Sequence, residues 1–143
     1  MTDTREIQEE IIDEFSILGD DKESTIYYIM EIGDKLAPFP ENERIEENII
    51  KGCQSKVWLT TRFEDNKVFF LADSNTDITK GLISLLIRVL SGRTPQEILD
   101  TDLYFINKIG MNNIIGSQRS NGLVSMIKQM KLFALAYQAK FNV

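Results

Sequence analysis

The sequence predicts an α+β fold in which a small three-stranded antiparallel sheet is covered by helices. Three short runs between residues 48 and 72 are rich in β-branched and aromatic side chains, which favour strands. Segments with apolar residues at helical spacing lie on both sides of these runs. Because a sheet of this size is unstable alone, its apolar face needs a helical layer.

Two amphipathic helices are predicted ahead of the sheet. The first begins at Asp3, which forms a capping-box pattern with Glu6, and ends near Gly19. The second begins near Asp21 and ends before Pro38, because proline cannot continue a helix. Its inward-facing side chains are expected to be Ile26, Ile29, Met30 and Leu36.

The three predicted strands occupy residues 48–50, 56–63 and 67–72. In the second strand apolar and more polar positions alternate, and Glu64-Asp65-Asn66 supplies a tight turn before the third. The expected inward positions are Val57, Leu59, Thr61 and Phe63. We also expect Trp58 to lie in the core or in a pocket wall, since aromatic residues on strands usually pack under a helix.

The chain after the sheet is predicted to be helical. One helix begins at Ser74 or Thr76 and ends at Gly92, a typical C-terminal stop. Thr94-Pro95-Gln96-Glu97 then combines a capping box with proline at the first helical position, and starts a short helix. The buried face of the longer helix is expected to consist of Ile78, Leu82, Leu85, Leu86 and Val89.

Two more helices complete the prediction. Residues 102–109 form one that ends at Gly110. After a polar connector, Asn121 opens the last helix, which continues to about Lys140. Its inward face is expected to carry Val124, Ile127, Met130 and Tyr137.

Composition limits the chemistry of this 143-residue chain, which we expect to form one domain over residues 1–143. It has one cysteine and no histidine, which excludes histidine-activated nucleophiles, haem ligation and the usual zinc sites. The N-terminus lacks a secretory signal and no apolar run is long enough to span a membrane, so we expect a cytoplasmic protein without membrane partners.

Charge is unevenly distributed along the chain, whose net charge is -6. Residues 1–47 contain 15 acidic and 4 basic side chains, whereas residues 48–143 contain 7 and 12. If the acidic part steers a partner of opposite sign, the affinity should fall as salt rises. The basic residues of the second part are scattered, which argues against nucleic acid as a partner.

The lone thiol, Cys53, lies in a loop between the first two predicted strands, with Lys51 and Lys56 on either side. Neighbouring cations favour the thiolate, whereas an apolar pocket raises the pKa of a thiol. A redox pair would need a second cysteine, and a phosphatase an arginine where Leu59 stands. Three interpretations remain open: a buried structural cysteine, a hydrolase with a lysine or carboxylate base, or an acceptor of sulfane sulfur.

The sequence resembles the SufE family, the sulfur-acceptor proteins of iron–sulfur cluster assembly, from about residue 5 to 140. The resemblance is carried by Glu47-Asn48-Ile49-Ile50-Lys51-Gly52-Cys53-Gln54-Ser55-Lys56-Val57-Trp58-Leu59, Ala72-Asp73-Ser74, Ile78-Thr79-Lys80-Gly81-Leu82 and Arg119-Ser120-Asn121-Gly122-Leu123. The Gly-Cys-Gln-Ser-x-Val-Trp block is highly specific to that family.

The resemblance implies a fold shared with IscU-type scaffold proteins and a role as a persulfide carrier. Cys53 would take sulfur from a pyridoxal-phosphate cysteine desulfurase of the SufS or CsdA type, stimulate it, and pass the sulfur to a SufB-type scaffold complex. The cofactor would belong to the desulfurase, so this chain is expected to bind none and to be no independent enzyme. A monomer or weak homodimer is expected. The alternative is a regulatory module that binds a desulfurase without accepting sulfur.

The resemblance also implies which residues support the thiol. They are Gly52, Gln54 and Ser55 in the loop, Asp73 and Ser74 after the third strand, and Arg119, whose guanidinium would favour a thiolate or persulfide anion. Two segments depart from the family pattern: Asn75 replaces a usual aspartate, and Gly116-Ser117-Gln118 replaces Ser-Pro-Ser. Asn75 can still cap the next helix, but any role that needs a negative charge at this position is lost.

Overall fold

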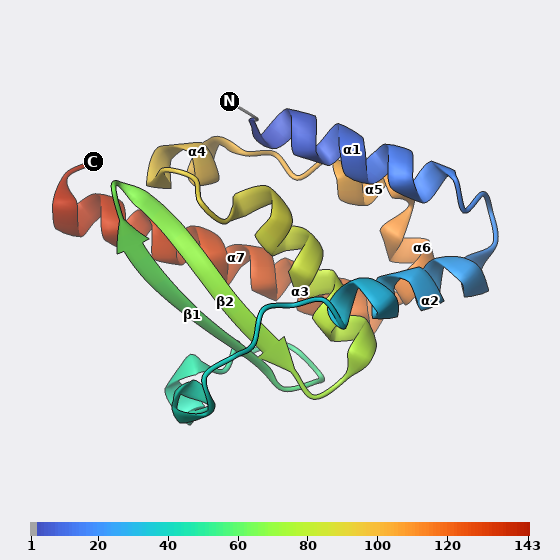
Figure 1. Ribbon diagram of the computed structural model, residues 1–143, viewed down its shortest axis with the longest axis horizontal. Coiled ribbons are helices and arrows are strands. Elements are labelled where there is room, and N and C mark those ends of the chain that lie inside the picture. The colour runs from blue at the N-terminus through green and yellow to red at the C-terminus, as the bar shows by residue number, and fades with distance from the viewer. Residues whose placement is uncertain (1–2) are drawn as a thin grey trace.

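Helices cover one face of a two-stranded antiparallel hairpin in the computed structural model, which describes residues 3–143 (Figure 1). The predicted domain also includes Met1 and Thr2, which lie outside the described residues. The elements are α1 (Thr4–Ser16), α2 (Lys22–Gly33), the 3₁₀ turns η1 (Glu41–Glu43) and η2 (Glu46–Asn48), β1 (Val57–Glu64), β2 (Lys67–Ser74), α3 (Asp77–Leu90), α4 (Pro95–Asp100), α5 (Phe105–Ile109), α6 (Met111–Ile115) and α7 (Ser117–Phe141). The predicted α+β class is therefore confirmed.

The hairpin pairs β1 with β2 from Val57 opposite Ser74 to Glu64 opposite Lys67. Its turn places Asp65 and Asn66 at positive φ, as two-residue hairpin turns require. This confirms the turn that was predicted from the sequence.

The first of the three predicted strands, residues 48–50, is wrong. Of residues 48–50, only Ile49 forms an isolated bridge to Trp58, and the Ile50 N–H donates to the Val57 carbonyl at 2.8 Å. The 3₁₀ turn η2 ends at Asn48, and Gly52 reverses the chain with a φ of +93°. Too few extended residues remain between these two bends to form a strand.

The two faces of the hairpin differ, as the predicted alternation requires. Val57 and Leu59 of β1, with Phe70 and Ala72 of β2, are buried against the helices. Trp58 lies on the opposite face and is only partly buried, so the expectation that it belongs to the core or to a pocket wall is wrong. Arg44, and not a helix, covers its ring.

Local capping signals locate the starts of α1, α2 and α4 correctly. The Glu6 N–H donates to the Asp3 carboxylate at 2.9 Å, and Asp21 caps α2. Thr94 and Glu97 form the complete capping box of α4. The predicted buried face of α3 is also confirmed. Within residues 3–143, no helix has both the length and the apolar character that crossing a membrane requires.

Two helix predictions need correction. The α2 helix ends at Gly33, so Leu36 packs against the core from the turn that follows. The polar connector is itself helical, and α7 begins at Ser117 instead of Asn121. Val124 is 64% exposed, because Leu123 and not Val124 lies on the buried stripe of α7, whereas Met130 is buried as predicted. That stripe consists of Gly122, Leu123, Met126, Met130 and Ala134.

A close crossing joins α2 to α3. A Cβ placed on Gly81 would lie 1.9 Å from the Ile29 carbonyl oxygen. A Cβ on Gly33 would lie 2.7 Å from the Gly81 nitrogen. The two helix backbones are therefore in direct contact, and a side chain at Gly81 has no space.

Gln8 is the buried polar link between α1 and the turn before α5. It is 1% exposed, its amide donates to the Asp102 carbonyl at 3.0 Å, and its Oε1 accepts from the Phe105 N–H at 3.1 Å. Gln8→Met should lower the free energy of unfolding by about 2 kcal/mol, since both backbone groups lose their partner inside the protein. Urea denaturation measures this, and exposed Glu9→Met is the neighbouring control. An unchanged midpoint for Gln8→Met would show that water replaces the lost contacts.

Candidate functional site

Cys53 lies in the loop of residues 51–56, which the Ile50–Val57 hydrogen bond closes at its base. The thiol is partly buried and lines a pocket of ≈ 300 Å³ between this loop, α3 and α7. Ile78, Leu82 and Met126 supply the apolar wall of the pocket. The loop therefore holds its thiol against the body of the protein and not free in solvent.

The thiol loop and α7 are in contact at Gly52 and Gly122. The Cys53 thiol donates to the Gly122 carbonyl at 3.5 Å, and a Cβ on Gly122 would lie 3.6 Å from the sulfur. Gly52 has a φ of +93°, and a Cβ there would lie 2.4 Å from the Ser125 Oγ. Gly52 is thus required both by its backbone conformation and by the proximity of α7.

Three hydroxyl groups form a closed ring on the α3 side of the pocket. The Thr76 hydroxyl donates to Thr79 at 2.8 Å, and the Thr79 hydroxyl donates to Ser55 at 3.3 Å. Ser55 and Thr76 are joined by a third hydrogen bond of 3.0 Å. This ring ties the loop to the first turn of α3.

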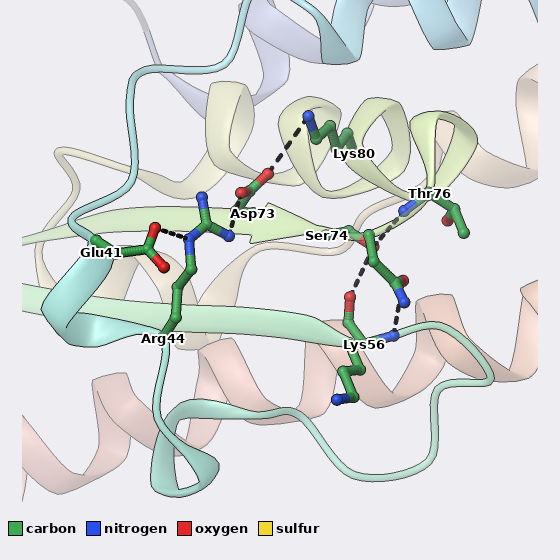
Figure 2. A network of polar contacts seen from close by, with 8 residues as sticks. Glu41, Arg44, Lys56, Asp73, Ser74, Thr76 and Lys80 are labelled. Atoms are coloured by element: carbon green, nitrogen blue, oxygen red, sulfur yellow. Dashed lines mark hydrogen bonds and ion pairs between the residues drawn. The ribbon is translucent and has the colours of Figure 1, made fainter.

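Ser74 and Asn75 hold the end of the loop at Lys56. The Ser74 hydroxyl donates to the Lys56 carbonyl at 2.7 Å (Figure 2). The Lys56 N–H donates to the Asn75 Oδ1 at 3.1 Å. The expectation that Asn75 caps α3 is wrong, because Thr76 occupies the N-cap position. A carboxylate oxygen could accept the same bond, so the replacement of aspartate by Asn75 preserves this contact.

Asp73 lies away from the pocket, on the outer face of the hairpin. It forms ion pairs with Arg44 and Lys80, seen together in Figure 2. Although burial alone would raise it, the pKa of Asp73 is lowered by its hydrogen bond from the Ser74 N–H and by Arg44. The structure thus separates Asp73 from Ser74, which the family resemblance had grouped together.

Arg119 lines the pocket together with Gln54 and Gln118. Its Nη1 donates to the Ile115 carbonyl at 3.4 Å, and no carboxylate within residues 3–143 forms an ion pair with it. The Arg119 side chain is exposed to solvent, which screens its charge. The role that the resemblance implied for Arg119, favouring a thiolate or persulfide anion, stays a prediction.

The local electrostatics decide the open question about the thiol. Burial raises the pKa of Cys53 above its usual value. The flanking Lys51 and Lys56 are both exposed and do not reverse this effect. The apolar surroundings outweigh the neighbouring cations, and the resting thiol stays protonated at neutral pH.

Alkylation of Cys53 should reach its half-maximal rate at a higher pH in the native protein than in the unfolded chain. Burial disfavours the charged thiolate, which is the reactive form. Iodoacetamide kinetics between pH 7 and 11, with the same chain unfolded in urea as reference, measure the two midpoints. A native midpoint at or below the unfolded one would contradict a burial-dominated thiol.

Sequence reasoning did not assign seven of the residues that line the pocket to the site: Thr76, Ile78, Thr79, Leu82, Gln118, Gly122 and Met126. Thr79 and Gly122 lie within the quoted family blocks, so those blocks carried a signal for them. In residues 3–143, no group of three or more histidine, cysteine, aspartate or glutamate side chains could hold a metal ion.

Comparisons with known proteins point to one family. A family model described as SufE, an Fe-S metabolism associated domain, matches residues 9–134. An uncharacterized SufE-like protein of Rhizobium meliloti is 38% identical over 128 residues, which are 86% of this chain and 91% of that protein. One of Synechocystis is 39% identical over 106 residues, which are 74% of this chain and 67% of that protein.

A solved structure has the same fold. The solution structure of a hypothetical protein from Thermus thermophilus matches with a TM-score of 0.75, covering 93% of this chain and 96% of that one. Its 18% identity makes this a likeness of fold alone. With the match to residues 9–134 and the two relatives above, the comparisons show that the chain belongs to the SufE family of proteins associated with Fe–S metabolism.

Proposed function

We propose that this protein accepts and carries persulfide sulfur. It docks a cysteine desulfurase of the SufS or CsdA type, takes sulfane sulfur on Cys53, stimulates the desulfurase and passes the sulfur to a SufB-type scaffold. The observation that carries this proposal is the pocket in which the chain's one thiol lies, lined by an apolar wall and by Arg119. Membership of a family associated with Fe–S metabolism supports the same role.

The transfer is a thiol exchange that needs no external oxidant or reductant. The Cys53 thiolate attacks the terminal sulfur of the donor persulfide, forming a new S–S bond. The donor's own S–S bond breaks, and its electron pair leaves with the donor thiolate. The proton of the Cys53 thiol passes to that leaving thiolate, directly or through water. Pyridoxal phosphate would act in the desulfurase, and we assign no cofactor to this chain.

The pocket suits the product better than the resting thiol. The fixed positive charge of Arg119 does not titrate at working pH and would stabilise a persulfide anion. Ser55, Thr76 and Thr79 line the same pocket, but one of their hydroxyl groups would donate to the anion only by breaking its hydrogen bond within the ring. The chain has no second cysteine, so a persulfide on Cys53 cannot be discharged as an internal disulfide.

Intact mass measurement tests this proposal. The protein is incubated with a cysteine desulfurase and cysteine, and the mass should increase by one or more sulfur atoms that a reductant removes. Cys53→Ser should acquire none and should lose the stimulation of the desulfurase. Acceptance of sulfur by Cys53→Ser, or no increment on the wild type, would reject the proposal.

A second candidate, a regulatory module that binds the desulfurase without accepting sulfur, is favoured by one observation. Partial burial raises the pKa of Cys53, so the resting thiol is a weak nucleophile. In that case Cys53→Ser would retain full stimulation of the desulfurase. The stimulation assay therefore separates the two candidates directly.

A further inference from the structure

Three consecutive residues at the end of β2, Asp73, Ser74 and Asn75, bind the chain both before and after Cys53. Ser74 and Asn75 bind the chain after Cys53, through the carbonyl and the N–H of Lys56. Asp73 points to the other face of the hairpin and binds the chain before Cys53, through an ion pair with Arg44. The chain between α2 and β1 crosses the hairpin before it reaches Cys53 (Figure 1).

Arg44 is held on several sides. Its guanidinium lies 5.3 Å from the Trp58 ring centroid and 5.4 Å from that of Phe39. It pairs with Asp73, whose side chain is only 15% exposed, and its Nε lies 2.9 Å from Glu41. Stacking and a planar fork of donors are properties of arginine that lysine does not share.

Short contacts connect Arg44 to the base of the thiol loop. The Asn48 amide donates to the Glu43 carbonyl at 2.8 Å and to the Glu43 carboxylate at 3.0 Å. Ile49 then bridges to Trp58, the residue on which Arg44 stacks. A displacement of Arg44 would therefore move the chain that enters the loop.

We propose that Arg44 is a positioning residue for Cys53, and that its ion pair with Asp73 keeps the thiol seated in its pocket. Only one consequence of this inference rests on the proposed function: displacing the thiol from its pocket should change the rate at which Cys53 accepts sulfur. Its first consequence concerns the thiol alone. Without the pair, the loop spends more time away from the pocket, and Cys53 reacts as an exposed thiol.

The test measures iodoacetamide alkylation of Cys53 as a function of pH in Arg44→Gln and Asp73→Asn. Each variant should react about threefold faster at pH 7.5, with its midpoint moved to lower pH, since the thiolate fraction changes tenfold per pKa unit. The double variant should react no faster than either single variant, because both remove the same pair. Arg44→Lys should fall between wild type and Arg44→Gln.

Arg62→Gln is the matched control. Arg62 also lies on the outer face of the hairpin, stacks on Phe69 at 4.5 Å and pairs with Glu64 at 3.1 Å, but near the hairpin turn. This variant should leave the alkylation of Cys53 at the wild-type rate. Equal acceleration in Arg62→Gln would overturn the proposal by showing a general loosening of the hairpin.

Other outcomes are also decisive. An unchanged alkylation profile in natively folded Arg44→Gln and Asp73→Asn overturns the proposal, even if both lower the unfolding midpoint. If alkylation changes as expected but wild-type Cys53 never acquires sulfur from a desulfurase, the proposed function fails and the positioning role stands. If the wild type acquires sulfur and the variants alkylate at the wild-type rate, the proposed function stands and the positioning role of Arg44 fails.

Discussion

Gly81→Ala is expected to lower the free energy of unfolding by roughly 3 kcal/mol, a large overpacking cost. The added Cβ would lie 1.9 Å from the Ile29 carbonyl oxygen and 2.5 Å from the Ile29 Cγ2. The first of these atoms belongs to the α2 backbone, which cannot move aside as a flexible side chain can. The two helices must separate, and the contacts along their crossing weaken together.

Urea denaturation followed by circular dichroism measures this effect. Ser84→Ala is the control, since it also introduces alanine into α3 and gains helix propensity without a backbone clash. Ser84→Ala should match or slightly exceed the wild type in stability. If Gly81→Ala were as stable as Ser84→Ala, the close contact between α2 and α3 would be disproved.

Gly52→Ala is expected to displace the thiol loop while the rest of the fold persists. The alanine would be strained at a φ of +93°, and its Cβ would lie 2.4 Å from the Ser125 Oγ. We expect a loss of about 2 kcal/mol in the free energy of unfolding. The loop should leave the pocket, so Cys53 should alkylate several times faster at neutral pH.

The double variant Gly52→Ala/Ser125→Ala separates the two causes. Removing the Ser125 hydroxyl relieves the shorter contact and leaves the backbone strain and a 3.3 Å contact to the Ser125 Cβ. Part of the stability and of the slow alkylation should return, while Ser125→Ala alone should resemble the wild type. Full recovery would show that the positive φ costs nothing, and no recovery would show that α7 does not restrict the loop.

Helix starts were predictable where one side chain bonds to the nearby backbone. Asp3, Asp21 and Thr94 each do so, and such contacts span only three or four residues. The start of α7 was not predictable in this way, since Gly116 precedes it without any side-chain cap. Residues 111–115 include two asparagines and read as a connector in sequence, yet Met111 and Ile115 bury one face of α6.

The failure of residues 48–50 to form a strand and the exposure of Val124 both depend on distant parts of the chain. Ile49 has strand-like neighbours, but Gly52 reverses the chain before a ladder can extend. Both Leu123 and Val124 fit an apolar face of α7, and only the position of the helix against the core selects Leu123. Local pattern alone could not decide either case.

In the site, too, some features follow from local sequence and others from tertiary contacts. The loop position of Cys53 and the pocket residues Ser55 and Arg119 follow from the sequence and its family resemblance. The opposite orientations of Asp73 and Ser74 follow from the strand's period of two, once both are known to lie within β2. Arg44 carried no signal in sequence, because it acts through tertiary contacts made from a loop.

Trp58 is the one tryptophan of the chain, and Arg44 stacks on its ring. The indole in β1 is therefore a fluorescent reporter of Arg44, which lies in the segment that leads to Cys53. Arg44→Gln should change its emission without unfolding the protein, because the ring exchanges a guanidinium for water. The seating of the thiol can thus be followed in real time while a desulfurase binds, without attaching a dye to the cysteine.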